Sequence, residues 1–442
     1  MLSCGWYYKF MYLTGSKWSM NRRRRRPNWF MIILLCLLIL AGSYVNRYII
    51  ADIQPIGVPT PTATIAPESL IAQAEGEFKE GKLIPAIETY KKAIASRPDD
   101  PAVYITLART QVFAGKYKDA QTSAEDALLL NPTNSMAFAV RGWALGFQGE
   151  YIEAESDIAR ALELDSNNSL AYAYHVEILV NSYYDGVSGY ESLEKAAEIS
   201  KVAQGLAPDA LETHRARGII LQATGTENYE QAIREYEAAV AINPNIADLH
   251  LSIGNCYRFL GDYEKAIDSF TRANALNPED PTPDLFMSRT YATRGEYGKA
   301  MQYAESAVTD NPTDTNLRGN LGVMYYRNSY WPEAVKELEY VVKGGTTEEG
   351  NQMEAMPLIP DSPRVAEYYF TYALTLSRLD KCGEALQIAQ LIISRIPSDE
   401  LAVENSNEVT NRCQQNLNAT PEPPLSTPTD EPVSTVEPTS TP

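Results

Sequence analysis

The chain has 442 residues, of which 44% are hydrophobic and 21% charged, a composition typical of folded proteins and unlike that of disordered or collagenous chains. One hydrophobic core rarely fills this length, so several domains or a repeat array are expected. Residues 1–28 hold seven of the 38 basic residues and no acidic residue. Residues 29–442 therefore carry 31 basic and 57 acidic residues, a net charge of −26. This acidity disfavours nucleic-acid binding by residues 51–442, because phosphate contacts require a basic face.

A run of seventeen uncharged residues, Trp29 to Val45, predicts a transmembrane helix. At about 1.5 Å per residue the run spans roughly 25 Å, the short end for a bilayer helix. Five arginines, Arg22 to Arg26, precede it and only Arg47 follows. Because cytoplasmic flanks are enriched in basic residues, residues 29–50 are expected to be a signal anchor, with residues 1–28 in the cytoplasm and the remainder of the chain outside it.

Two alternatives remain open near the N-terminus. Ala41 and Ser43 are small and suitably spaced for a signal peptidase, so the apolar segment could be cleaved. Met20, which precedes the arginines by one residue, Asn21, could be the true start of translation.

Segments rich in proline and threonine lie at residues 51–66 and 419–442. Proline fixes φ and removes an amide donor, so such segments stay extended and build no core. We predict a semi-rigid linker for the first and a disordered tail for the second, with a Pro-rich ligand or a glycosylated stalk as the alternative. This composition, together with the absence of organelle signals, favours a bacterial cell envelope as the location.

Alanines recur through residues 67–399 with a period near 34 residues, and most of them follow an aromatic residue by three positions. Their successive separations are 34, 34, 42, 36, 34, 34, 34 and 51 residues. Other small residues stand seven positions later and twelve positions earlier in most units. The recurring alanines are Ala86, Ala120, Ala154, Ala196, Ala232, Ala266, Ala300, Ala334 and Ala385.

Each unit contains two stretches of about fourteen residues with apolar residues at helical spacing, separated by turns such as Gly115-Lys116-Tyr117. Two helices approach closely only where both present a small residue, which accounts for the alanines and glycines. A proline closes most units because it cannot supply an interior amide. One helix pair cannot bury its own faces, so the units are expected to stack into a superhelix.

This pattern resembles the tetratricopeptide repeat, a 34-residue helix-turn-helix with small residues at the crossing, an aromatic after the turn and a closing proline. The resemblance implies an all-α fold, a right-handed solenoid of about nine units, here preceded by one transmembrane helix. It says little about function, because the shared residues are packing residues. The units are expected near 67–100, 101–134, 135–168, 169–210, 211–246, 247–280, 281–314, 315–348 and 366–399.

An insertion, Gly344 to Pro363, interrupts the array before its last unit. Loops of this length are usually functional or disordered. We expect disorder here, with a ligand-facing flap as the alternative. Residues 400–418 are predicted to form a single helix that caps the array, as the end of a repeat stack requires.

Catalytic material is scarce in the sequence. Glycine-rich phosphate loops, the nucleophile elbow Gly-x-Ser-x-Gly and His-Glu-x-x-His are all absent. His175, His214 and His250 fall at packing positions, and no Cys-x-x-Cys pair exists to hold a structural metal. We predict no enzymatic activity, no cofactor and no metal site.

In the tetratricopeptide family, the first helix of each unit lines the concave surface. Applied to this chain, that rule places arginines and aromatic residues inward, the composition of binding hot spots for carboxylates and apolar anchors. We expect the groove, especially across residues 250–330, to hold an extended acidic or aromatic-bearing peptide, the alternative being a concave face that is merely solvated. The predicted groove residues are Arg109, Phe113, Trp143, Tyr174, Arg215, Asn255, Arg258, Phe259, Phe286, Arg289, Asn320, Tyr326 and Arg327, with Phe147, Glu177 and Arg378 beside them.

Within this frame, Cys382 follows the turn of the last unit and Cys413 lies late in the expected cap helix, so both should lie at the same end of the stack. An oxidising exterior permits a disulfide between them, and two separate buried thiols are the alternative.

The leading interpretation is a membrane-anchored scaffold with an unidentified protein or peptide partner. The alternative is a non-catalytic recruiting subunit of an envelope enzyme complex that handles glycans or exported proteins.

Overall fold

The computed structural model describes residues 28–48, 66–348 and 350–418. The predicted basic N-terminus and C-terminal tail, and nearly all of the predicted linker, therefore lie outside the described residues. The chain divides into two compact units, Met1–Thr64 and Ile65–Pro442. In the first, one helix is described, α1 (Trp29–Tyr48), and its large apolar side chains from Trp29 to Leu40 are exposed. Within the described part of the chain, no helix is long and apolar enough to cross a membrane.

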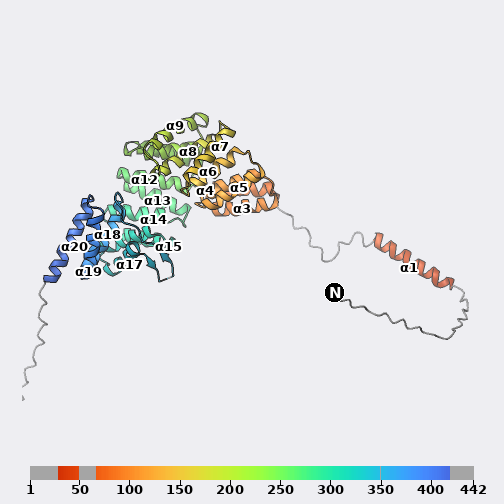
Figure 1. Cartoon of the computed structure of the whole chain (residues 1–442). Helices are drawn as coiled ribbons and strands as arrows, with labels where there is room; N and C mark the ends of the chain where they lie inside the picture. Colours follow the sequence, from red (N-terminus) through yellow and green to blue (C-terminus); the bar gives the residue numbers. More distant parts are fainter. Residues whose placement is uncertain (1–27, 49–65, 349, 419–442) are drawn as a thin grey trace, which may run out of the picture. The chain divides into compact units, whose positions relative to one another are not determined.

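The second unit is built from helices that pair in chain order (Figure 1), which confirms the predicted all-α repeat architecture. Its described residues form nine such pairs and a final single helix. The pairs are α2 (Pro67–Lys79) with α3 (Leu83–Ser96), α4 (Pro101–Phe113) with α5 (Tyr117–Leu130), α6 (Ser135–Gly146) with α7 (Tyr151–Leu164), α8 (Ser169–Tyr184) with α9 (Glu191–Leu206), α10 (Leu211–Ala223) with α11 (Tyr229–Ile242), α12 (Ala247–Leu260) with α13 (Tyr263–Leu276), α14 (Thr282–Thr293) with α15 (Tyr297–Asp310), α16 (Thr315–Arg327) with α17 (Trp331–Lys343), and α18 (Pro363–Arg378) with α19 (Cys382–Arg395), followed by α20 (Glu400–Asn418).

Small residues lie where the two helices of a pair cross. The recurring alanines, from Ala86 to Ala385, are completely buried. At Gly254 in α12, an added Cβ would lie 2.6 Å from the ring of Phe270 in α13, closer than any real Cβ contact. The residue is therefore glycine because the partner helix presents a large ring at that point, and larger side chains would force the helices apart.

Acidic and amide side chains begin many of the first helices. Asp100, Asn134, Asn168 and Asp314 each accept a hydrogen bond from a backbone N–H in the first turn of α4, α6, α8 and α16. Such N-caps contribute about 1 kcal/mol each. They define the turn between one unit and the next.

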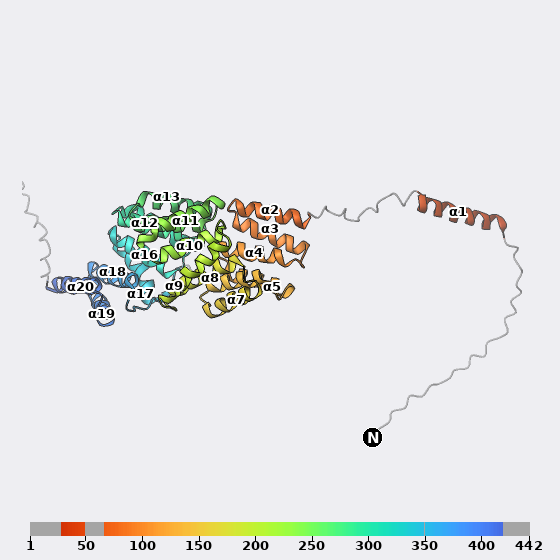
Figure 2. The same cartoon turned by 90° about the horizontal axis from the view of Figure 1, so that it is seen from above.

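The coil closes on itself between the first unit and the α11–α12 turn (Figure 2). The Asn245 amide donates a 2.7 Å hydrogen bond to the carbonyl of Lys79, and Arg272 in α13 donates to the Asn245 side-chain oxygen at 3.0 Å. Gly81, in the α2–α3 turn, lies directly against Asn245. Units far apart in the sequence are therefore neighbours in space.

The insertion before the last unit is ordered, so the expectation of disorder is wrong for its described residues. Strands β1 (Gly345–Thr346) and β2 (Gln352–Met353) form a short antiparallel hairpin. Met353 and Leu358 are buried, and the Tyr369 hydroxyl donates to the carbonyl of Met356 at 2.8 Å. These apolar residues and this hydrogen bond attach the insertion to α18.

The array ends in α20, which packs against α18 and α19. A disulfide joins Cys382 at the start of α19 to Cys413 in α20, with their Cα atoms 5.5 Å apart. A cross-link over a separation of 31 residues stabilises by about 3–4 kcal/mol in the chain-entropy model. Ala402, Val409 and Cys413 are completely buried, so the disulfide reinforces an apolar contact.

Replacing Gly81 with alanine tests the closure of the coil. Gly81 and Gly115 occupy equivalent turns, with φ of +75° and +70°. Alanine costs about 1–2 kcal/mol of left-handed strain at either. At Gly81 its Cβ would also lie 2.6 Å from the Asn245 carbonyl oxygen, whereas nothing lies within 4 Å at Gly115. We expect Gly81→Ala to lose about 1–3 kcal/mol more stability in urea denaturation than Gly115→Ala; equal losses would contradict the closure.

Candidate functional site

The first helices of the units supply the side chains of the concave face. Most of the predicted groove residues, together with Glu212, Asp248 and Arg364, fall into two groups there. Those from α4 to α10 form a buried or half-buried set that we call the inner network: Arg109, Phe113, Trp143, Tyr174, Glu177, Glu212, Arg215 and Asp248, the last from the start of α12. Those from α12 and α14, with Arg364 of α18, form a second set that we call the arginine cluster: Arg258, Arg289 and Arg364.

Aromatic stacking organises the inner network. Trp143 in α6 is buried, and Tyr174 in α8 stacks on it with ring centroids 4.2 Å apart. The ring of Phe113 meets Trp143 edge-on at 5.2 Å. The Trp143 indole N–H donates a 2.8 Å hydrogen bond to the buried carboxylate of Glu177. Three successive first helices are thereby joined across the interior of the coil.

The arginines of the inner network are paired with carboxylates of the chain itself. Arg215 lies 3.1 Å from the Glu177 carboxylate and 2.8 Å from that of Asp248, and its guanidinium stands over the ring of Trp143 at 5.5 Å. Arg109 pairs with Glu212, which comes from a helix three units further along the chain. Arg109 and Arg215 each retain one buried nitrogen without a hydrogen-bond partner, but their charges are compensated by these carboxylates, so they offer little net charge to a ligand.

Burial raises the pKa of Glu177 to about 7, although Arg215 and the Trp143 N–H both act in the opposite direction. Glu177 is 1% exposed. Its ionised form therefore loses more through lost hydration than it gains from its partners.

The arginine cluster lacks such compensation. Within the described residues, neither Arg258 nor Arg289 has an ion pair with a carboxylate. Arg258 donates to the side-chain oxygen of Asn255 at 3.1 Å and Arg289 to that of Asn316 at 3.5 Å, while the Nε atoms of both arginines are buried without a hydrogen-bond partner. Arg364 is exposed and pairs with Glu367 one turn along α18 at 2.6 Å. Positive charge therefore exceeds negative charge here.

Burial lowers the pKa of Arg258 and of Arg289, and the positive charge of Arg364 acts in the same direction on both. Arg289 adds to the repulsion at Arg258. With Glu367 as the one counter-charge described near these three arginines, the excess positive charge attracts an anion, because its binding relieves the repulsion and satisfies the guanidinium donors.

Two phenylalanines flank the arginine cluster. The guanidinium of Arg258 lies 4.3 Å from the ring centroid of Phe259 and 5.6 Å from that of Phe286. Phe259 is 54% exposed, while Phe286 packs partly buried against Phe270. An apolar side chain beside an anion would find contact area on these rings.

The remaining predicted residues lie apart from the cluster or inside the packing. Asn320 is 2% exposed and donates to Ser288 at 2.9 Å, a contact between neighbouring units. Arg327 is exposed and lies over the ring of Tyr297. Tyr326 contacts Trp331, and Arg378 lies over both rings at 5.6 and 4.9 Å.

Sequence reasoning missed Arg364 and Asn316, and it missed Glu212 and Asp248 as partners of the inner arginines. Arg364 comes directly after the insertion, so the 34-residue period does not predict which residues of that helix face the concave surface. Asp248 could have been predicted as a partner, because it lies in the first turn of α12, the first helix of its unit, and this turn faces the neighbouring first helix.

The histidines take part in packing and in local hydrogen bonds. His175 is buried, His214 lies 2.8 Å from the Glu235 carboxylate, and His250 lies 2.9 Å from the carbonyl of Pro244. Among the described residues, no three histidine, cysteine, aspartate or glutamate side chains come together as metal ligands would.

Comparison with known proteins identifies the repeat. Residues 77–143 and 247–280 each match a family model described as tetratricopeptide repeat, which confirms the resemblance seen in the sequence. No curated protein matches the chain in sequence.

Solved structures similar to the chain include a tetratricopeptide repeat protein from Parabacteroides merdae, 16% identical with a TM-score of 0.38 over 58% of this chain and 98% of that one. PilW, a type IV pilus biogenesis factor, is 20% identical with a TM-score of 0.40 over 47% and 91%. The human IFIT1 dimer is 18% identical with a TM-score of 0.46 over 70% and 79%. Likeness at this level says nothing of what the chain binds.

Glu177 gives the stability of the coil a predictable pH dependence. Its folded-state pKa of about 7 lies above the value of about 4.3 for an unfolded chain. The folded state therefore binds this proton more tightly, so the contribution of Glu177 to the free energy of unfolding falls as pH rises from about 4.5 to 7.

Glu177→Gln keeps an acceptor for the Trp143 N–H and cannot ionise. We expect the difference in urea midpoint, wild type minus Glu177→Gln, to fall as pH rises from about 4.5 to 7. Parallel curves over this range would show that burial does not govern this carboxyl.

Proposed function

We propose that this chain, a tetratricopeptide repeat protein, is a scaffold that holds an extended acidic segment of a partner protein against the arginine cluster. Repeats of this family support protein–protein interaction, and their concave faces offer extended binding surfaces. No chemistry is assigned to the chain in this role.

The observation that carries the proposal is the contrast between the two sets of arginines. Arg109 and Arg215 are paired with buried carboxylates, whereas Arg258 and Arg289 are half-buried, have Nε atoms without a hydrogen-bond partner, and have no ion pair with a carboxylate within the described residues. A guanidinium recognises a carboxylate through two parallel hydrogen bonds. The donors left free by the fold therefore match an acidic segment.

The charge of the whole chain sharpens this preference. Residues 29–442 carry a net charge of −26, so an acidic partner is repelled by most of the surface. A local positive site on such a protein directs the partner to one place and one orientation. The exposed ring of Phe259 adds apolar area beside that site.

We also propose that residues 29–50, which extend beyond α1, anchor the scaffold in a bacterial cell membrane, with the repeat array on the outer side. The seventeen uncharged residues from Trp29 to Val45 and the arginines before them support this proposal. The disulfide between Cys382 and Cys413 suits an oxidising compartment.

The arginine cluster can be tested with a labelled peptide of about twelve residues that carries several glutamates and one phenylalanine. We expect Arg258→Gln, Arg289→Gln and Arg364→Gln together to weaken its binding at least tenfold in fluorescence anisotropy at physiological salt. Each lost guanidinium–carboxylate contact removes about 1 kcal/mol or more of binding free energy.

The matched control removes three exposed arginines from second helices, Arg160→Gln, Arg234→Gln and Arg395→Gln. This variant loses the same net charge and should retain binding. Equal weakening in both variants, or equal affinity for a peptide with glutamine in place of glutamate, would refute the site.

Membrane attachment is tested by Leu35→Arg with Leu38→Arg in the full chain. Two arginines near the centre of the run cost roughly 5–7 kcal/mol of insertion, so the variant should leave the carbonate-washed membrane fraction. Leu35→Ala with Leu38→Ala should stay in it. Recovery of the wild-type chain in the soluble fraction would contradict the anchor.

A further inference from the structure

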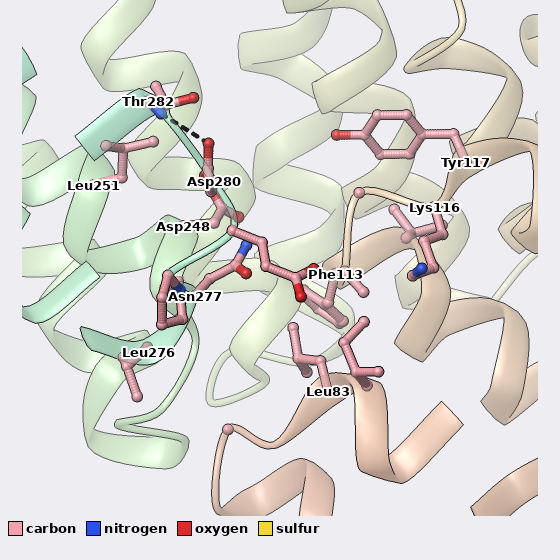
Figure 3. Close-up of a pocket in the computed structure, with 18 of the residues that line it drawn as sticks. Leu83, Phe113, Lys116, Tyr117, Asp248, Leu251, Leu276, Asn277, Asp280 and Thr282 are labelled. Carbon is pink, nitrogen blue, oxygen red and sulfur yellow. Dashed lines mark hydrogen bonds between the residues drawn. The ribbon is translucent and has the colours of Figure 1, made fainter. Parts of the chain in front are cut away.

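A second site lies inside the closed part of the coil, away from the arginine cluster. The first two units face the sixth and seventh across a pocket of about 800 Å³ (Figure 3), a volume within the range of small-molecule sites. We call it the chamber. Its borders are the α2–α3 turn, the α4–α5 turn and the α13–α14 turn, with Trp143, Phe147 and Arg215 behind them.

One wall of the chamber is aromatic. Tyr117 and Phe147 stack with ring centroids 4.7 Å apart and planes within 4° of parallel, and Phe113 and Trp143 continue the wall. In Figure 3, Tyr117 points across the chamber towards the side where Asp248 and Asp280 lie. The guanidinium of Arg215 already lies over Phe113 and Trp143, at 5.6 and 5.5 Å. The Tyr117–Phe147 stack is therefore the part of this wall whose electron-rich rings can attract another cation.

The opposite wall carries three carboxylates, Asp248, Glu279 and Asp280. Asp248 is paired with Arg215, but Glu177 shares that guanidinium. Asp280 accepts a 2.9 Å hydrogen bond from the backbone N–H of Thr282, and neither it nor Glu279 has an ion pair among the described residues.

The cations that line the chamber do not balance these acids. Lys82 is already paired with Glu80 at 2.8 Å. Lys116 is exposed at the end of the α4–α5 turn, and it is the one lysine of the lining that has no ion pair within the described residues. Arg215 faces two carboxylates, so the chamber keeps a negative excess. Burial, with Asp248 and Asp280, raises the pKa of Tyr117 to about 12, in keeping with that excess.

We propose that the chamber binds an alkylammonium group on a linear aliphatic amine, with the carboxylates of Glu279 and Asp280 facing the charge and the Tyr117–Phe147 stack lying along the chain. The same chemistry occurs on a free polyamine and on a lysine side chain of a partner. A carboxylate and a π face together discriminate against neutral and anionic ligands. The site is opposite in charge to the arginine cluster and independent of it.

The chain offers a matched pair of variants for a test. Glu279→Gln with Asp280→Asn removes two charges from the chamber. Asp99→Asn with Asp100→Asn removes two from the corresponding turn of the first unit, where Asp100 accepts from the N–H of Ala102 at 3.0 Å. Asparagine is as good an N-cap as aspartate, so both variants should fold, and thermal unfolding checks this.

Spermidine and the peptide Gly-Lys-Gly-Lys-Gly serve as probes in isothermal titration calorimetry with the full chain at physiological salt. We expect at least one probe to bind the wild type and the Asp99/Asp100 variant alike, and the Glu279/Asp280 variant at least tenfold more weakly. Binding of spermidine alone identifies a free polyamine as the source, and binding of the peptide identifies a partner lysine.

Two results would overturn the proposal. One is no binding of either probe to the wild type. The other is equal affinity of the two variants. If both are weakened, the attraction is general to an acidic protein, and if both bind like the wild type, the amine binds elsewhere. The Arg258, Arg289 and Arg364 triple variant should bind the amine probes normally, so failure of this site and failure of the arginine cluster are distinguishable.

Discussion

The structure depends on close approach of paired helices at small side chains. Ala86 and its counterparts through Ala385 have no exposed surface, and at Gly254 even one more carbon would overlap the partner helix. This constraint sets the angle within each pair, and stacking repeats that angle until the coil turns through a full circuit. The concave face follows from it, because the first helices supply most of the interior and the second helices reach it near their ends, as Tyr117 of α5 does.

The curvature of the coil determines which inward-facing side chains remain available to a ligand. Where the coil is closed, its interior is narrow, so Arg109 and Arg215 meet carboxylates from units further along the chain. In the later units, α18 brings the guanidinium of Arg364 near Arg258 and Arg289, and neither of these two arginines has an ion pair with a carboxylate within the described residues. The same type of residue at the same position of the repeat thus stabilises the fold in one half and faces a ligand in the other.

The helices and their order could be predicted from the sequence because each unit repeats the same local packing problem. The arginine cluster could be predicted only in part. Arg258 and Arg289 occupy regular positions, but Arg364 follows an insertion that shifts the register. The pairing of Arg109 could not be read at all, because its partner Glu212 is 103 residues away and meets it only through the cumulative curvature of three units. The ordered insertion was missed because Met353 and Leu358 form no periodic pattern.

The contact between Gly81 and Asn245 changes the thermodynamics of the whole array. An open solenoid is nearly one-dimensional, so its stability is a sum over neighbours and its ends can fray independently. Here the first unit is also held by the α11–α12 turn, so it cannot melt without losing a contact to the middle of the chain. We therefore expect units one to six to unfold as one cooperative block. Their closure joins residues far apart in the sequence, so it forms only after the sixth unit has folded.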